Sequence, residues 1–90
     1  MIEKAWVCQV VEFEAGWGSR PDGMILARTV GEGKALDRPD GHLCGDEREY
    51  STTVGEWREV ELTEKGQAAL THKSAVWVHN NVNDYFKGML

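Results

Sequence analysis

Residues 5–14, "AWVCQVVEFE", and residues 24–30, "MILARTV", decide the fold of this chain. Both stretches are rich in the β-branched, aromatic and other apolar residues that favour strands. In the first stretch, apolar side chains fall on both faces, which is typical of a central strand covered on each side. Residues 15–23, "AGWGSRPDG", interrupt the pattern with three glycines and a proline. We therefore expect a β-hairpin with a long tip over residues 15–23.

Working outward, the chain alternates short helices with further strands. Residues 29–38, "TVGEGKALDR", favour a short helix that its glycines weaken. Residues 49–54 indicate a short edge strand, residues 57–62 a half-exposed strand and residues 75–79 another strand. Thr63 is a good N-cap for a helix that follows it. The predicted fold class is α+β, with an N-terminal β-hairpin and a small antiparallel or mixed sheet with two to three short helices.

The C-terminal segment carries an apolar stripe at helical spacing. Asn81 or Asn83 can cap a last helix there. Such a stripe is more often packed on the core of its own chain than exposed as an interface. A small domain has little core with which to cover it, so self-association through the stripe is the alternative. The stripe consists of Val82, Tyr85, Phe86, Met89 and Leu90.

Composition limits the classes of function. A length of 90 residues predicts a single domain, residues 1–90. The net charge of −5 disfavours binding to duplex nucleic acid or to an anionic membrane. Two cysteines form no spaced framework and the opening residues carry charges, so we expect a cytoplasmic protein. The pattern His42-x-Cys44, followed by Asp46 and Glu47, has no second ligand cluster, so we predict no metal. Cys8 lies in the middle of a predicted strand and Ser19 has no histidine nearby in the sequence, so we predict no catalytic residue; we also predict no cofactor.

One tetrapeptide, Arg-Pro-Asp-Gly, occurs twice, at residues 20–23 and 38–41. Proline fixes φ at the second position of a turn, and glycine supplies a positive φ at the fourth. We interpret both copies as the same turn chemistry rather than as a duplicated site. The first copy would close the hairpin with a bulge at Gly23.

The residues around the first copy could bind a ligand. Glycines let backbone N–H groups approach a ligand closely, an indole stacks on a base, and arginine pairs with phosphate. A nucleotide-like ligand uses all three features. The competing interpretation is that Trp17 folds back onto the core and Arg20 pairs with Asp22. The candidate residues are Gly16, Trp17, Gly18, Ser19, Arg20, Pro21 and Asp22.

Residues 12–23, "EFEAGWGSRPDG", lie between two predicted strands and resemble a pattern of small phage-encoded proteins. The pattern is a Glu/Tyr-rich strand, then Gly-aromatic-Gly-polar-Arg-x-Asp, then a second strand. The functional group it resembles is the Thoeris anti-defence sponges, which assemble as homo-oligomers and sequester cyclic nucleotide-type immune signals without cleaving them. Only Lys87 follows Lys73 among the basic residues, so a C-terminal arginine clamp on phosphate is absent from this sequence.

The resemblance implies a non-catalytic anti-defence protein, located in the host cytoplasm if phage-encoded, that sequesters a nucleotide-like molecule. It implies that Ser19, Arg20, Pro21 and Asp22 contact the ligand from the hairpin tip. It also implies that Trp77, Asn80 and Asn81 add stacking and amide hydrogen bonds. The alternative function is an acidic protein–protein inhibitor of a host nuclease or defence complex. An enzyme of undetected type is the third function that the sequence leaves open.

Overall fold

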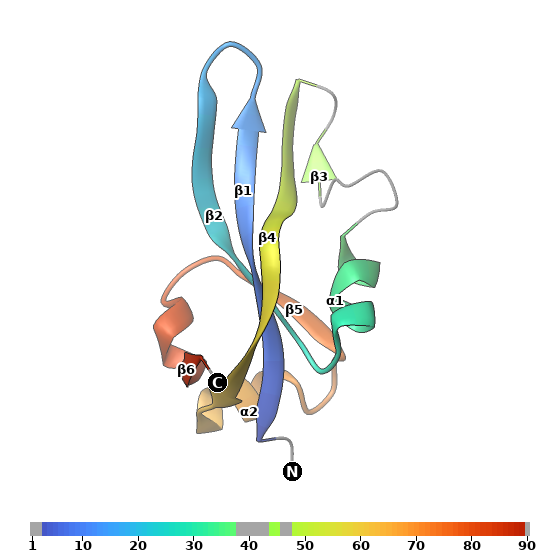
Figure 1. Ribbon diagram of the computed structural model, residues 1–90, viewed down its shortest axis with the longest axis vertical. Helices are drawn as coiled ribbons and strands as arrows, with labels where there is room; N and C mark the ends of the chain where they lie inside the picture. The colour runs from blue at the N-terminus through green and yellow to red at the C-terminus, as the bar shows by residue number, and fades with distance from the viewer. Residues whose placement is uncertain (1–2, 38–43, 46–47, 90) are drawn as a thin grey trace.

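The computed structural model describes residues 3–37, 44–45 and 48–89 (Figure 1). In this part of the chain one antiparallel sheet has the strand order β3-β4-β1-β2-β5, and β6 pairs with β4. The expected α+β class with an N-terminal hairpin is confirmed in this broad form, with short helices. The elements are β1 (Lys4–Glu14), β2 (Gly18–Ala27), α1 (Val30–Leu36), β3 (Cys44–Gly45), β4 (Glu49–Leu62), α2 (Glu64–Ala69), β5 (Ala75–Val78), the 3-10 turn η1 (Val82–Asp84) and β6 (Phe86–Met89).

Strand β1 lies between β2 and β4 and has buried side chains on both faces, as expected. Adjacent residues of β2 belong to different core clusters: Leu26 to one, Ile25 and Ala27 to the other. Because successive side chains of a strand point to opposite faces, the two clusters lie on opposite faces of the sheet. The first comprises Ala5, Val7, Leu26, Val60, Leu62, Leu70 and Val78, and the second Val10, Ile25 and Ala27.

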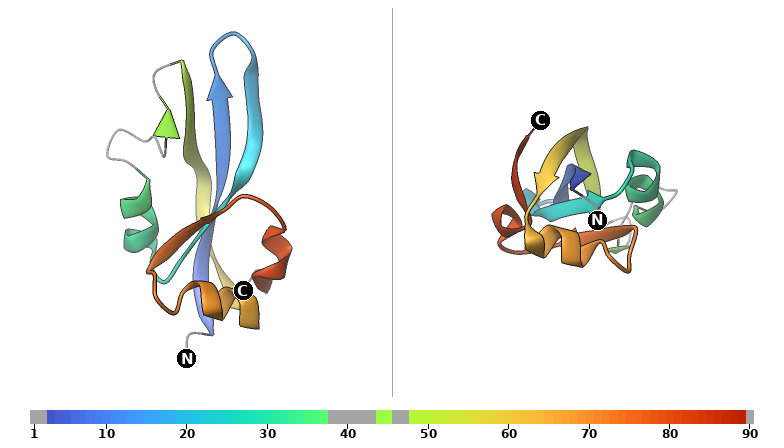
Figure 2. Two further views of the ribbon diagram at one scale, coloured as in Figure 1. Left: turned by 180° about the vertical axis from the view of Figure 1, so that it is seen from behind. Right: turned by 90° about the horizontal axis from the view of Figure 1, so that it is seen from below.

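Different segments cover the two clusters. Val82, Tyr85 and Phe86 pack on the first, so these stripe residues form a core face within the chain. Trp57 and Trp77 pack on the second. Helix α1 and the η1–β6 segment accordingly lie on opposite sides of the strands (Figure 2). Both clusters belong to one half of the long strands, and the hairpin end extends beyond both α-helices (Figure 1).

The hairpin turn is shorter than the sequence pattern predicted. Only residues 15–17 form the turn, closed by Trp17 N–H donating to Glu14 O at 3.0 Å. Gly16 and Gly18 flank Trp17 with φ of 84° and 92°, conformations that favour glycine. The expected long tip was therefore wrong, because these two glycines reverse the chain within three residues and the strand resumes at Gly18.

The first Arg-Pro-Asp-Gly copy consequently lies inside β2 and is not a turn. The register passes from Val11↔Pro21 to Gln9↔Met24, so two β2 residues oppose one β1 residue at a bulge. The bulge expected at Gly23 exists, with φ of 84° there, but the chain does not reverse at it. The second copy, residues 38–41, lies outside the described residues.

Two further expectations about strands were wrong. Residues 49–54 and 57–62 form one continuous strand, β4, because a bulge at Gly55 joins them. The last segment forms η1 and then β6 rather than a helix. Strand β6 pairs with residues 60–62 of β4, and so supplies partners to backbone groups that would otherwise stand at a sheet edge.

Both α-helices begin where the sequence indicated. Thr29 Oγ1 accepts a hydrogen bond from Glu32 N–H at 3.1 Å, and Thr63 Oγ1 accepts one from Gly66 N–H at 3.2 Å. These are N-cap contacts that satisfy first-turn donors. Neither described helix has the length and apolar character that a membrane crossing requires.

Candidate functional site

A groove forms where β5 meets the bulge in β2. Gly23 lies so close to β5 that an added Cβ would stand 2.0 Å from Val78 O. No other residue permits this approach together with its positive φ. The contact brings the segment after β5 alongside Pro21, although residues 21 and 79–82 are far apart in the sequence.

The groove is open and has a volume of about 510 Å³. This volume falls in the range of small-molecule sites. The lining combines the apolar side chains of Pro21, Met24 and Val82 with polar ones that can donate and accept hydrogen bonds. Its lining comprises Gln9, Pro21, Gly23, Met24, His79, Asn80, Asn81 and Val82. Asn81 adopts the left-handed conformation with φ of 55°, which turns the chain along the groove.

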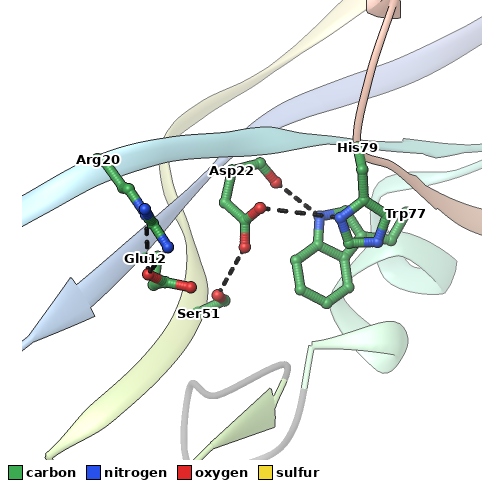
Figure 3. Close-up of polar contacts among 6 residues, drawn as sticks. All are labelled: Glu12, Arg20, Asp22, Ser51, Trp77 and His79. Atoms are coloured by element: carbon green, nitrogen blue, oxygen red, sulfur yellow. Dashed lines mark hydrogen bonds and ion pairs between the residues drawn. The ribbon is translucent and has the colours of Figure 1, made fainter.

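Beneath the groove, Asp22 joins β2 to β4 and to the end of β5 (Figure 3). Its Oδ2 accepts a hydrogen bond from Ser51 Oγ at 2.9 Å, and its Oδ1 lies 3.8 Å from His79 Nδ1. Trp77 Nε1 donates to the backbone oxygen of Asp22 at 2.8 Å. The His79 ring packs on the Trp77 indole with 4.2 Å between centroids. These contacts hold the His79 ring against the Trp77 indole.

This arrangement does not assemble a nucleophile. Ser51 Oγ donates to the carboxylate and not to the imidazole, and Ser51 is 1% exposed. A serine nucleophile needs a base within hydrogen-bond reach and access to substrate. Cys8 is also buried, and its thiol contacts Val54 O at 3.4 Å. Burial, and next the charge of Asp37, raise the pKa of the Cys8 thiol above its ordinary value of 9.0, which keeps the thiol protonated.

The hairpin end presents an exposed indole. Trp17 is 85% exposed, so the interpretation that it folds back onto the core is wrong. A shallow hollow of about 70 Å³ lies beside it, lined by Glu12, Glu14, Trp17, Gly18, Ser19 and Arg20. The flanking glycines serve the turn geometry described above.

Arg20 is held by a carboxylate of the neighbouring strand. Its Nε and Nη2 both lie near Glu12 Oε1, at 2.9 and 2.7 Å (Figure 3). The register pairs Glu12 with Arg20 directly across the hairpin. The alternative partner considered for Arg20, Asp22, instead contacts Ser51 and His79.

The structure divides the ten expected ligand residues among separate places. Pro21, Asn80 and Asn81 come together in the groove. Asp22 and Trp77 belong to the network beneath it, and the Trp77 ring is already in contact with His79 and the second core cluster. The remaining five lie in or beside the turn: Gly16, Trp17, Gly18, Ser19 and Arg20.

Sequence reasoning missed Gln9, Met24 and His79 in the groove, and Glu12 as the partner of Arg20. Gln9 carried a signal, since it is the one polar residue in the apolar run of residues 5–11. Glu12 would have followed from a turn placed at residues 15–17, because that turn puts residues 12 and 20 opposite each other. His79 depends on the bulge at Gly23, which the sequence did not locate relative to β5.

The chain matches no known protein family, no curated protein and no solved structure.

Proposed function

We propose that this protein is a non-catalytic, phage-type anti-defence protein that sequesters a nucleotide-like signalling molecule. The observation that carries the proposal is the convergence of Pro21, Asn80 and Asn81 on one groove of about 510 Å³. The resemblance of residues 12–23 to small phage sponges suggested the same ligand class. The groove, rather than the hairpin end, is the site that we assign to the ligand.

The groove lining suits a planar heterocycle with hydrogen-bonding edges. Pro21, Met24 and Val82 offer apolar contact to a ring face. Gln9, Asn80 and Asn81 are exposed, and each amide both donates and accepts, as the edge of a nucleobase requires. Among the described residues that line the groove, His79 alone has a basic side chain.

Phosphates of the ligand would therefore stay largely in solvent. No Lys or Arg is among the groove-lining residues in the part of the chain that the structure describes. Recognition would rest on the base and sugar, and we expect affinity to depend little on the number of phosphates or on salt.

Calorimetric titration with a panel of cyclic nucleotides and cyclic ADP-ribose isomers tests the proposal. We expect one class of compound to bind and, in mass spectrometry after denaturation of the complex, to be recovered unchanged. Asn80→Ala should weaken binding about tenfold, because it removes hydrogen bonds worth about 1 to 1.5 kcal/mol.

Asn83→Ala is the matched control, since Asn83 is exposed and lies outside the groove. It should bind like the unaltered protein. The proposal fails if no compound binds, if Asn80→Ala and Asn83→Ala bind equally well, or if the recovered compound has been altered.

We further propose that the protein acts as a homo-oligomer through the face of the hairpin that carries Val11 and Phe13. Both side chains are half-buried, and Phe13 stacks on Tyr50 with 5.4 Å between ring centroids. The hairpin end extends beyond both α-helices, so a second copy has access to this apolar row (Figure 1).

A further inference from the structure

We propose that the hairpin end is a docking surface for a protein partner that presents a lysine or arginine beside an apolar recess. The surface consists of Trp17 with Glu12, Glu14 and Arg20 around it. It is separate from the groove, and the inference does not depend on what the groove binds.

The exposure of Trp17 is the first argument. An indole that is 85% exposed contributes little to the stability of its own chain. Tryptophan and arginine are the residue types most enriched among those that dominate binding energy in protein interfaces. Trp17 lies in the hairpin turn and Arg20 lines the hollow beside it. The hairpin forms one end of a molecule that is 43 Å long and about 20 Å wide (Figure 1). A projecting indole can enter a recess in another protein.

The size of the hollow argues against a small molecule at this place. Its volume is about 70 Å³. Sites that bury most of a small ligand have volumes of roughly 300 to 1,000 Å³. A ligand at the hairpin end would keep most of its surface in water, whereas a protein can cover the indole from outside.

The charges at the hairpin end determine which sign of charge a partner must carry. Glu12 engages Arg20 through two nitrogens, at 2.9 and 2.7 Å. A phosphate would have to displace this carboxylate and then face Glu14, which lines the same hollow. A cation meets the opposite situation: Glu12 and Arg20 balance each other's charge, and the carboxylate of Glu14 and the indole face of Trp17 both attract an ammonium or guanidinium group.

The same charges exclude other macromolecules. Nucleic acids and anionic membranes would bring further negative charge to Glu12 and Glu14. A second copy that presented its own hairpin end here would place its Glu12 and Glu14 against the same two carboxylates; the apolar row of Val11 and Phe13 lies on the other face of the strands. A basic protein surface is the complementary choice.

The backbone holds the indole ready for contact. Trp17 N–H donates to Glu14 O at 3.0 Å, and Ala15 N–H donates to Arg48 O at 2.7 Å, which ties the turn to the chain just before β4. A turn fixed in this way loses less conformational freedom when a partner binds.

Selection of a displayed random-peptide library on the full-length protein, with counter-selection on Trp17→Ala, tests the proposal. We expect enriched peptides that carry Lys or Arg next to apolar residues. Their affinity should fall about tenfold or more in Trp17→Ala and about threefold in Glu14→Gln. It should also weaken when salt rises from about 50 to about 500 mM, because screening weakens exposed charge pairs.

Leu36→Ala is the control for loss of an exposed apolar side chain, since Leu36 is 39% exposed in α1, away from the hairpin. It should leave peptide affinity unchanged. Enrichment of acidic or uncharged peptides overturns the proposal, as does equal binding to Trp17→Ala or the absence of any Trp17-dependent peptide. Calorimetry with nucleotides on Asn80→Ala reports on the groove alone, so failure of either proposal is recognised separately.

Discussion

At the scale of the residue, Asp22 connects three side chains that the sequence separates widely. Its carboxylate contacts Ser51 and His79, and its backbone oxygen accepts the indole N–H of Trp77. We expected this residue to contact ligand from a hairpin tip. The bulge at Gly23 instead directs it beneath the groove, where its polar contacts are made within the chain.

Replacing Asp22 should show how much its contact with Ser51 contributes to the free energy of unfolding. Asp22→Ala leaves the hydroxyl of Ser51, which is 1% exposed, without this acceptor. The free energy of unfolding should fall by about 1 to 3 kcal/mol, the usual penalty for a buried unpaired polar group. Asp22→Asn keeps an acceptor oxygen and should lose less. Urea unfolding followed by tryptophan fluorescence measures both, and equal losses would contradict this explanation.

At the scale of the element, helix α1 is shaped by what it packs against. Gly33 is buried, and a Cβ added there would lie 2.2 Å from Cη2 of Trp57. A Cβ added at Gly31, two residues earlier in the same helix, would meet no other described side chain nearer than Thr29 Oγ1, at 4.0 Å. The sequence showed two helix-weakening glycines as equivalent, but only one of them is needed for packing.

The two glycines should therefore respond in opposite directions. Gly31→Ala should raise the free energy of unfolding by about 0.5 to 1 kcal/mol, because alanine loses less backbone entropy in a helix. Gly33→Ala should lower it by about 1 to 3 kcal/mol, because Trp57 must move. Chemical denaturation of the two single variants measures the difference, and stabilisation by both would show that Trp57 yields without cost.

How far an element could be predicted depended on whether its signals were local. Thr63 was expected to cap its helix, and Thr29, the first residue of the predicted helix at residues 29–38, caps the other; each of these contacts spans only three residues. Strand β6 depends on the edge of β4, and the joining of residues 49–62 depends on register with β1. Helical spacing of Val82, Tyr85 and Phe86 correctly placed them on a core, but the same contacts are made by a 3-10 turn and a strand.

The candidate site was predictable in parts only. Pro21 and Asn80 were singled out for polar and turn chemistry, and the structure brings them to one groove. The partner of Arg20 was not predicted. Glu12 lies opposite Arg20 only because the turn has three residues, 15–17, and not the nine that were expected. Charge at the hairpin end follows from that register and not from composition.

At the scale of the whole molecule, the long strands serve two different regions. Near the helices they carry core clusters on both faces, and toward the hairpin end they carry a half-buried apolar row on one face and charged residues on the other. The first region supplies most of the buried apolar surface. The second supplies surface for contact with other molecules.

Self-association through the apolar row should be visible in sedimentation velocity. We expect a species larger than one chain at tens of micromolar protein, and Val11→Lys should shift it toward one chain, since a buried unpaired charge opposes association. Ala68→Lys adds the same charge at an exposed position of α2 and should leave the distribution unchanged. A single-chain species at all concentrations, or equal behaviour of the two variants, would contradict the oligomer.

The continuity of β2 through the bulge at Gly23 has a consequence for the two surfaces. Arg20, which lines the hollow, and Pro21, which lines the groove, are consecutive residues of this strand, with no loop between them. A guest that shifts the strand at one place thereby alters the geometry at the other. A small molecule in the groove would then change the dissociation constant of the protein partner by some factor. Thermodynamic reciprocity requires the partner to change the dissociation constant of the small molecule by the same factor.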